Sequence, residues 1–256
     1  MTISIAIAAF LASLLTLFSG FGLGTLLMPV AAIFLPVAVA IALTALVHLL
    51  NTVFKLALMR RWVDWRVALW FGLPALMAAL PGAWLLTQMT QWPAWVDYDW
   101  LGWQAEITPV KLLVGLLLMA FAIAEWRNLA KRFAVKPRLL PLGGVLSGFF
   151  GGLSGHQGAF RSAFLLHAGL DAQAFIATNA AIAMLVDIAR LAVYGLNLQL
   201  LTAKTDIPLI AAATAAAFAG VMVGRIGVHK VTISAIQRLV AGLLLLLGMA
   251  LIAGII

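Results

Sequence analysis

The chain has 256 residues, of which 65% are hydrophobic and 9% charged, with a formal net charge of +8 and no cysteine. Soluble domains contain about a quarter charged residues, so this composition predicts an integral membrane protein, and disulfides and thiolate chemistry are excluded. Several apolar stretches exceed the roughly 18 to 20 residues that a membrane-spanning helix needs, and none alternates like a barrel strand. We expect an all-α polytopic membrane protein without a separate soluble domain.

Ten apolar segments follow one another along the chain, and four of them are too short for comfortable spans. In chain order they cover about 3–18, 25–35, 37–59, 67–89, 110–126, 139–153, 159–170, 172–195, 206–224 and 232–255. The first two, within 3–35, are together too long for one crossing and too short for two, and the same holds within 139–170. We expect each pair to form a re-entrant hairpin or a severely broken helix.

The passage around each break occurs twice, 135 residues apart. The first copy begins Ser19-Gly20-Phe21-Gly22 and the second Ser154-Gly155-His156-Gln157-Gly158, and at the same offset Lys55 corresponds to Arg190. Paired breaks at corresponding positions of two halves indicate a transporter's binding site. The sequence therefore predicts two repeats, 1–130 and 131–256, each with a glycine-broken hairpin and three transmembrane helices.

The positions of the basic residues predict the topology. Most of them lie in the short loops 60–66, 127–138 and 225–230. Basic loops favour the cytoplasm, and all three face it only if both short pairs are re-entrant, which places 90–109 and both chain ends outside. The two repeats then have inverted topology, a geometry that places a shared site near the middle of the membrane. Because orientation in a lipid bilayer explains the positive charge, we expect no nucleic-acid partner.

Polar side chains within the expected spans are a second signal, because an ionisable residue there costs about 2.5 to 3.5 kcal/mol on insertion scales. In the helix after the first break, a polar stripe with spacings of 4, 3 and 4 consists of Thr44, His48, Asn51 and Lys55. The matching helix of the second half carries Asn179, Asp187 and Arg190. Such residues must face protein or a water-filled cavity.

Each of these residues also has a purely structural interpretation. Asp187 and Arg190 are spaced to pair on one helix and to neutralise each other. Lys55 has no such neighbour, and it either lies along an anion path or extends to the nearby membrane surface. His48 and His156 could relay protons or remain neutral and hydrogen-bonded, so proton coupling stays open.

The breaks themselves favour an anion. Short helices that begin at about Thr25 and Ala159 would direct their positive N-termini at the turns. Arg161 adds a planar guanidinium that can hold two oxygens of a sulfonate, sulfite or carboxylate. Alternatively, Arg161 pairs with Asp187 or reaches water, and the glycines only allow close helix packing.

Three passages resemble the TauE/SafE sulfite exporter family. They are the glycine-rich break with Pro29 downstream, the passage from Asn51 to Trp65 that ends Arg60-Arg61-Trp62-Val63-Asp64-Trp65, and the string Ser154-Gly155-His156-Gln157-Gly158-Ala159-Phe160-Arg161-Ser162. The resemblance covers nearly the whole chain. It implies a transporter in the bacterial inner membrane that exports sulfur oxyanions or organosulfonates, such as sulfite or sulfoacetate, from the cytoplasm.

We therefore expect a cofactor-free and metal-free transporter that exports a small sulfur-containing anion through a central site, nearer the second break. The expected substrate-binding residues are Arg161, His156, Gln157, Asn51, Asn179, Gly22 and Gly158. The expected path or coupling residues are Thr44, His48, Lys55, Asp187 and Arg190. A channel-like anion or cation pore on the same scaffold is the alternative function. An enzyme would need a nucleophile with its base or a metal triad, neither of which we can assemble from this sequence.

Overall fold

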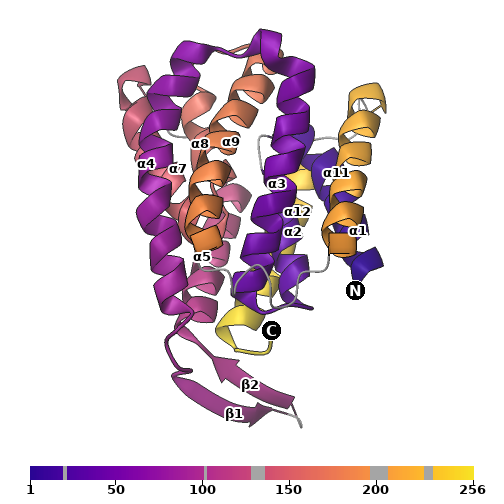
Figure 1. Ribbon diagram of the computed structural model, residues 1–256, viewed down its shortest axis with the longest axis vertical. Coiled ribbons are helices and arrows are strands. Elements are labelled where there is room, and N and C mark those ends of the chain that lie inside the picture. Colours follow the sequence, from indigo (N-terminus) through magenta and orange to yellow (C-terminus); the bar gives the residue numbers. More distant parts are fainter. Residues whose placement is uncertain (20–21, 101–102, 128–135, 197–206, 228–232) are drawn as a thin grey trace.

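The structure is a computed structural model and describes the chain apart from residues 20–21, 101–102, 128–135, 197–206 and 228–232. The described residues form a helical bundle with a small β hairpin projecting from one end (Figure 1). In chain order the elements are α1 (Thr2–Ser19), α2 (Gly24–Ala32), α3 (Val37–Met59), η1 (Arg60–Trp62), α4 (Trp65–Met89), β1 (Val96–Trp100), β2 (Trp103–Ile107), α5 (Pro109–Trp126), η2 (Pro137–Leu139), α7 (Leu140–Ser154), α8 (Gly158–Leu165), α9 (Ala172–Leu196), α11 (Ile207–Gly227) and α12 (Ile233–Ile252).

Each of the ten expected apolar segments overlaps with one of these helices, whose ends differ from the expected ones by up to five residues. Four described helices are long and apolar enough to cross a membrane, and they cover Val37–Trp62, Trp65–Met89, Ala172–Gly195 and Ile207–Gly224. Shorter apolar stretches lie in α1, α5 and α12. Among the described α-helices, the two shortest are α2 and α8, which have 9 and 8 residues and directly follow the two breaks. The chain is a multi-pass helical membrane protein.

Local sequence explains how the helices next to the polar residues begin and end. Asp64 caps α4, because its side chain accepts a hydrogen bond of 3.0 Å from the backbone N–H of Val67. The backbone N–H of Asp64 also donates to the hydroxyl of Thr178 at 3.0 Å, which ties the start of α4 to α9. At the second break, α7 ends because Gly155 adopts a left-handed conformation with φ of +79°.

The segment expected as an outward loop, 90–109, contains an antiparallel hairpin that the sequence interpretation missed. Strands β1 and β2 pair with Val96 opposite Ile107 and Asp99 opposite Gln104. The backbone N–H of Glu106 donates to the carbonyl of Gly254 at 3.1 Å, which fastens the hairpin to the chain just after α12. Polar and apolar residues alternate along both strands, and this period of two is the signal that could have predicted them.

Helices of the two halves pack against one another in a reciprocal pattern. The first half's α1 and α4 lie against α11 and α7 of the second half, while α3 lies against α9 and α5 against α12 (Figure 1). A stripe of glycines on α7 allows a close approach to α4, since a Cβ atom on any of them would overlap a backbone carbonyl of α4. The stripe consists of Gly144, Gly148 and Gly152. Small residues let membrane helices approach backbone to backbone.

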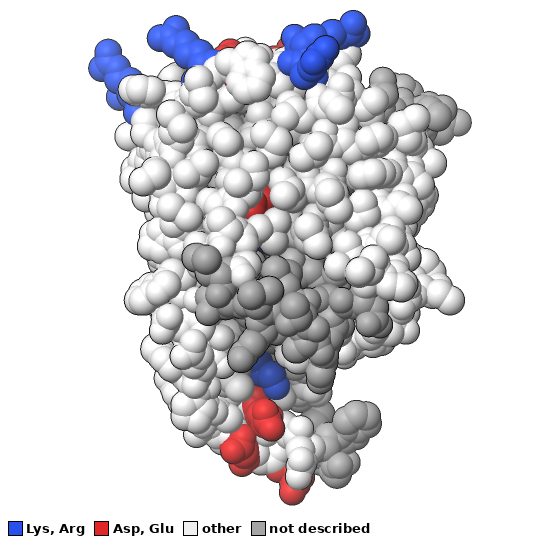
Figure 2. All heavy atoms as spheres, viewed as in Figure 1, with Lys and Arg blue, Asp and Glu red and all other residues white. Residues whose placement is uncertain are grey.

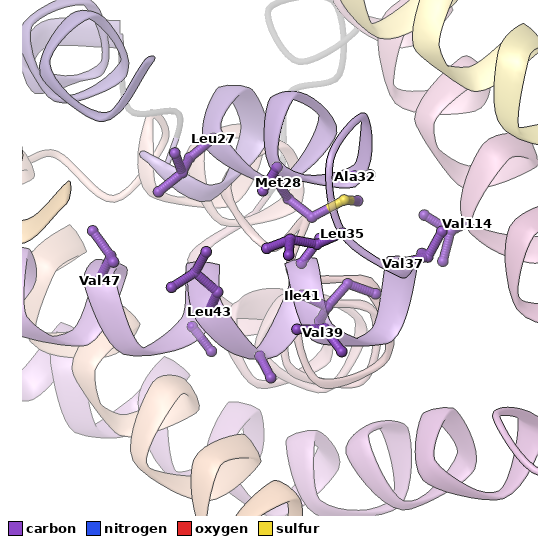
Figure 3. Packing of buried hydrophobic residues seen from close by; sticks show 14 of the residues in the cluster. Leu27, Met28, Ala32, Leu35, Val37, Val39, Ile41, Leu43, Val47 and Val114 are labelled. Atoms are coloured by element: carbon purple, nitrogen blue, oxygen red, sulfur yellow. The ribbon is translucent and has the colours of Figure 1, made fainter. Parts of the chain in front are cut away.

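A compact apolar cluster fills the space between α2, the start of α3 and α5. Figure 3 shows Leu27 and Met28 of α2, with Leu35 of the following turn, beside Leu43 of α3 and near Val114 of α5. These five side chains are buried. We call these five residues, together with Ala40, Ile41 and Ala42 of α3, the apolar plug.

The two ends of the bundle differ in charge. Figure 2 shows Lys and Arg side chains projecting from the end opposite the hairpin, and Asp and Glu gathered at the hairpin end with a basic side chain close by. The hairpin carries Asp97, Asp99 and Glu106. Both chain ends lie in the half of the molecule nearer the hairpin (Figure 1). Of the other two basic loops, residues 128–135 and 228–230 lie outside the described residues, and 225–227 form the end of α11.

Candidate functional site

The two breaks meet inside the bundle. Helix α2 begins at Gly24 and α8 at Gly158, each one residue earlier than expected. A Cβ atom on Gly24 would lie 3.4 Å from the carbonyl oxygen of Gly155, in the second break, and 3.4 Å from the methyl group of Thr44. The N-terminus of α2 therefore lies beside both the polar stripe of α3 and the second break.

Neighbouring side chains hold the second break in place. The hydroxyl of Ser147, on α7, donates to the carbonyl of Gln157 at 3.0 Å. Gly155 lies directly against a guanidinium, since a Cβ atom at that position would be 2.8 Å from Nη1 of Arg190. The phenol of Tyr194 donates to the carbonyl of Gly152 at 2.5 Å. Helix α9 thus supports the backbone of the break through two of its side chains.

Asp187 is the centre of a buried hydrogen-bonded group. Its Oδ2 lies 2.5 Å from Nδ1 of His48, which comes from α3 in the other half. Its Oδ1 accepts from Nε of Arg190 at 3.0 Å and lies 2.7 Å from Nη2 of the same residue. Nε2 of Gln157 donates to Oδ1 at 3.3 Å. The ion pair expected from the spacing of Asp187 and Arg190 is confirmed, and it extends to both halves.

His48 links this group to the first break. A Cβ atom on Gly22 would lie 2.9 Å from Nε2 of His48, so the imidazole lies directly beside the glycine. Its other ring nitrogen is the one beside Asp187. The two breaks are thus connected through the side chains of His48 and Asp187, both almost completely buried.

Arg161 lies in the same region with an unused hydrogen-bond donor. Its side chain is 1% exposed, and Nε donates to the side-chain oxygen of Asn179. Nη1 has no hydrogen-bond partner within the described part of the chain. Arg161 lies within electrostatic range of Lys55, Asp187 and Arg190. Arg161 is thus buried rather than exposed to solvent, and its side chain is hydrogen-bonded to the amide of Asn179.

Lys55 is buried rather than extended to the surface, with 8% of the residue exposed. Within the described ranges, its ammonium group has neither a hydrogen-bond acceptor nor a carboxylate partner. We refer to Lys55, Arg161, Arg190, Asp187 and His48 as the central cluster. The central cluster therefore contains three basic side chains and one carboxylate besides the imidazole of His48, all of them buried.

Several buried polar atoms around the central cluster lack partners among the described residues. They are Thr44 Oγ1, Asn51 Nδ2, His156 Nε2, Gln157 Oε1, Arg161 Nη1 and Arg190 Nη1. A buried polar atom without a partner costs about 1 to 3 kcal/mol. Most of these atoms are donors or can become donors. A ligand rich in acceptor oxygens would satisfy them.

Asn51 and His156 are each held by a neighbour that the sequence did not suggest. The hydroxyl of Ser13, on α1, donates to the side-chain oxygen of Asn51 at 3.3 Å. Nδ1 of His156 lies 2.8 Å from the carbonyl oxygen of Ser154, and its ring stacks on Phe121 with centroids 6.1 Å apart. These contacts leave Asn51 Nδ2 and His156 Nε2 for another partner. Helix α1 contains three serines, Ser4, Ser13 and Ser19, so the sequence did not single out Ser13.

A cavity of about 600 Å³ lies at the hairpin end of the bundle. Its lining includes Pro36 and Val39 at the start of α3, and Thr108 and Lys111 at the start of α5. Between Val39 and the polar stripe, α3 contributes only apolar side chains to the plug. The cavity and the central cluster are therefore separated along α3 by part of the apolar plug.

Among known protein families, a model described as Sulfite exporter TauE/SafE matches residues 5–251. No curated protein and no solved structure matches the chain significantly. The matched range includes both breaks and every residue of the central cluster.

Proposed function

The chain belongs to the TauE/SafE sulfite exporter family, and from this membership we propose that it exports sulfite, sulfoacetate or a related organosulfonate from the cytoplasm. The family implies a membrane exporter of sulfite-like anions. The observation that carries our finer proposal is the excess of basic over acidic side chains in the buried central cluster, where Lys55, Arg161 and Arg190 share the one carboxylate of Asp187. Charge inside a membrane protein is costly unless an opposite charge compensates it, so the cluster favours an anion.

In this proposal the anion binds beside Arg161. The free Nη1 atom and the planar guanidinium suit two oxygens of a sulfonate or sulfite group. Asn179 fixes the orientation of the guanidinium through its hydrogen bond to Nε. Lys55 contributes a second positive charge on the side of α3.

The remaining contacts come from the two breaks and the polar stripe. Free polar atoms of Gln157, His156 and Asn51 complete the hydrogen bonding. Backbone N–H groups near Gly22 and Gly158, at the N-termini of the short helices, add partial positive charge.

Reciprocal packing supports the proposal of two inverted repeats, 1–130 and 131–256. The contact of α1 with α11 corresponds to that of α7 with α4, and α3 and α5 each lie against their counterparts α9 and α12. Inverted repeats place a shared site near the bilayer midplane, where the two breaks would meet. The basic end of the bundle then faces the cytoplasm. The hairpin and both chain ends lie on the opposite, outer side of the inner membrane.

A carrier fits this arrangement better than an open pore. The apolar plug lies between the central cluster and the cavity at the hairpin end, so the anion passes only if α2 and α3 separate there. An inside-negative potential favours anion export by about 2.3 kcal/mol per charge per 100 mV.

Efflux of labelled sulfite and sulfoacetate from proteoliposomes tests the proposal. Arg161→Ala should abolish most of the efflux, while Arg138→Ala, an exposed arginine in η2, should leave it unchanged. Unchanged efflux in Arg161→Ala would contradict the site. Steady conductance in planar bilayers, without saturation at high anion concentration, would favour the pore instead.

A further inference from the structure

Neighbouring groups fix the orientation of the Gln157 side chain in the second break. The residue is 1% exposed, and its backbone carbonyl accepts from the hydroxyl of Ser147 at 3.0 Å and from the backbone N–H of Arg161 at 3.1 Å. Its Nε2 donates to Oδ1 of Asp187 at 3.3 Å, and the same Oδ1 accepts from Arg190. Because this carboxylate oxygen is paired with a guanidinium, it can only accept. The amide therefore directs its nitrogen at Asp187 and its oxygen elsewhere.

The amide oxygen Oε1 of Gln157 is thus a buried acceptor, and it has no hydrogen-bond partner among the described residues. It differs from the other partnerless atoms around the central cluster. Those of Asn51, Arg161 and Arg190 only donate, while the hydroxyl and imidazole atoms can do either. Fully ionised sulfite and sulfoacetate offer oxygens to these donors but supply no hydrogen to Oε1. A ligand that satisfies the whole site must therefore also donate a hydrogen bond.

The free acceptor and the proposed anion-binding arginine lie on one face of α8. Gln157 precedes the first residue of this helix, and Arg161 follows four residues later, about 6 Å along the axis. Both side chains extend to α9, where Gln157 contacts Asp187 and Arg161 contacts Asn179. A sulfonate beside Arg161 that carries a substituent two carbons away can extend along this face towards Gln157.

We propose that the exported anion is a hydroxyalkanesulfonate, whose sulfonate lies beside Arg161 and whose hydroxyl donates to Oε1 of Gln157. This inference rests on the proposed function and names the substrate class of the same site. A hydroxyl suits the site better than an ammonium group, because basic side chains already outnumber the carboxylate in the central cluster. Gln157 then determines specificity, since an anion without the hydroxyl leaves a buried acceptor unpaired.

The inference predicts a preference between two sulfonates that differ by one hydroxyl. Isethionate is ethanesulfonate with a terminal hydroxyl, and both are monoanions near neutral pH. A difference between their dissociation constants therefore reports the hydroxyl rather than the charge. Calorimetry on the purified full-length protein should show that isethionate binds about tenfold more tightly, because an unpaired buried acceptor carries a penalty of this order. Taurine, which has an ammonium group in place of the hydroxyl, should bind more weakly than isethionate.

Gln157→Met removes the acceptor and keeps a side chain of similar length. The ratio of the two dissociation constants should fall to about one in this variant, while ethanesulfonate still binds. Gln104→Met, at an exposed glutamine of β2, is the matched control and should keep the wild-type ratio. The ratio is the readout because a purely structural change at Gln157 would weaken the binding of both anions alike.

Three outcomes would overturn the inference. They are equal affinity of wild type for isethionate and ethanesulfonate, tighter binding of taurine than of isethionate, and a preference for isethionate that persists in Gln157→Met. Equal affinity would leave sulfonate export standing and remove only the hydroxyl. If wild type binds none of these sulfonates and no sulfite, the proposed function fails as well.

Should Gln157→Met fail to fold, the methyl ether of isethionate is titrated against wild type instead. This ether keeps the oxygen of the hydroxyl but cannot donate a hydrogen bond. It should bind no more tightly than ethanesulfonate. Binding as tight as that of isethionate would show that the protein does not read a donor on the anion, and the inference would be wrong.

Discussion

Nδ1 of His48 lies 2.5 Å from Oδ2 of Asp187, across a sequence separation of 139 residues. The imidazole also lies against the first break at Gly22, and the carboxylate is hydrogen-bonded to Gln157 in the second break. If one break moves relative to the other, the His48–Asp187 pair either moves with them or separates. The pair is therefore a direct side-chain connection between the two halves within the central cluster.

Asp187→Asn should destabilise the protein strongly. The substitution removes the counter-charge of Arg190 and the partner of His48, and breaking a buried ion pair from one side costs about 3 to 5 kcal/mol. Thermal unfolding in detergent checks this expectation. Asp171→Asn is the matched control, because Asp171 is exposed and an asparagine can also cap the start of α9. Equal melting temperatures for the two variants would contradict the central position of Asp187.

Arg161→Lys should retain positive charge and still lose most transport. Lysine has no planar fork, so it cannot hold two anion oxygens and the side chain of Asn179 together. Loss of one hydrogen bond to a charged group, about 1.5 to 3 kcal/mol, corresponds to a reduction of affinity of tenfold or more. Initial efflux rates over a range of internal sulfoacetate concentrations give the change. Full transport activity in this variant would mean that a positive charge at position 161 is enough to bind the anion, without the planar guanidinium.

Gly155→Ala should impair transport more than Gly169→Ala. Both glycines have positive φ, +79° and +75°, so an added Cβ atom is strained at each. Only at Gly155 would that atom also lie 2.8 Å from Nη1 of Arg190, while Gly169 has open space around it. The difference between the two variants isolates the contact with the guanidinium. Efflux assays and melting curves of both should be compared, and similar effects would show that backbone strain alone matters.

Gly148→Ala should destabilise the contact between α7 and α4. A methyl group on Gly148 would overlap the backbone of Ala75, and the two helices would have to separate. Gly242→Ala, in α12, has nothing within 4 Å of the added atom and should be neutral or stabilising by up to about 1 kcal/mol. Unfolding of both variants in the same detergent measures the contrast. A neutral Gly148→Ala would mean that the helices are less tightly packed than described.

Labelling of single cysteines should confirm the orientation, since the natural chain contains none to interfere. Asp99→Cys on the hairpin should react with a membrane-impermeant maleimide added to intact cells. Arg61→Cys, equally exposed but at the basic end, should react only after permeabilisation. The reverse pattern would invert the proposed topology and with it the direction of export.

Much of the architecture could be predicted from local properties of the sequence. Apolar length located the helices, because a bilayer of fixed thickness requires long apolar runs and short runs cannot span it. Glycines located the breaks, and α2 and α8 begin at Gly24 and Gly158 as a result. The pairing of Asp187 with Arg190 followed from their spacing of three on one helix.

Contacts between residues far apart in the sequence could not be predicted from these local patterns. His48 and Asp187 come from different halves, and aligning the copies at a fixed offset does not reveal that they touch. Asn179 was expected as a ligand of the anion, yet its oxygen accepts a hydrogen bond from Arg161. The hairpin β1–β2 was missed because its alternating pattern is short and the rest of the chain is strongly helical.

The exchange of partners between the halves has a consequence for biosynthesis. Helix α4 leaves the ribosome well before α7, whose glycine stripe it needs, and α1 must wait even longer for α11. The first half therefore enters the bilayer as an unfinished assembly, with lipid covering surfaces that later become protein contacts. Two separately synthesised halves, divided between α5 and η2, should associate in the membrane, because most helices of each half pack against helices of the other.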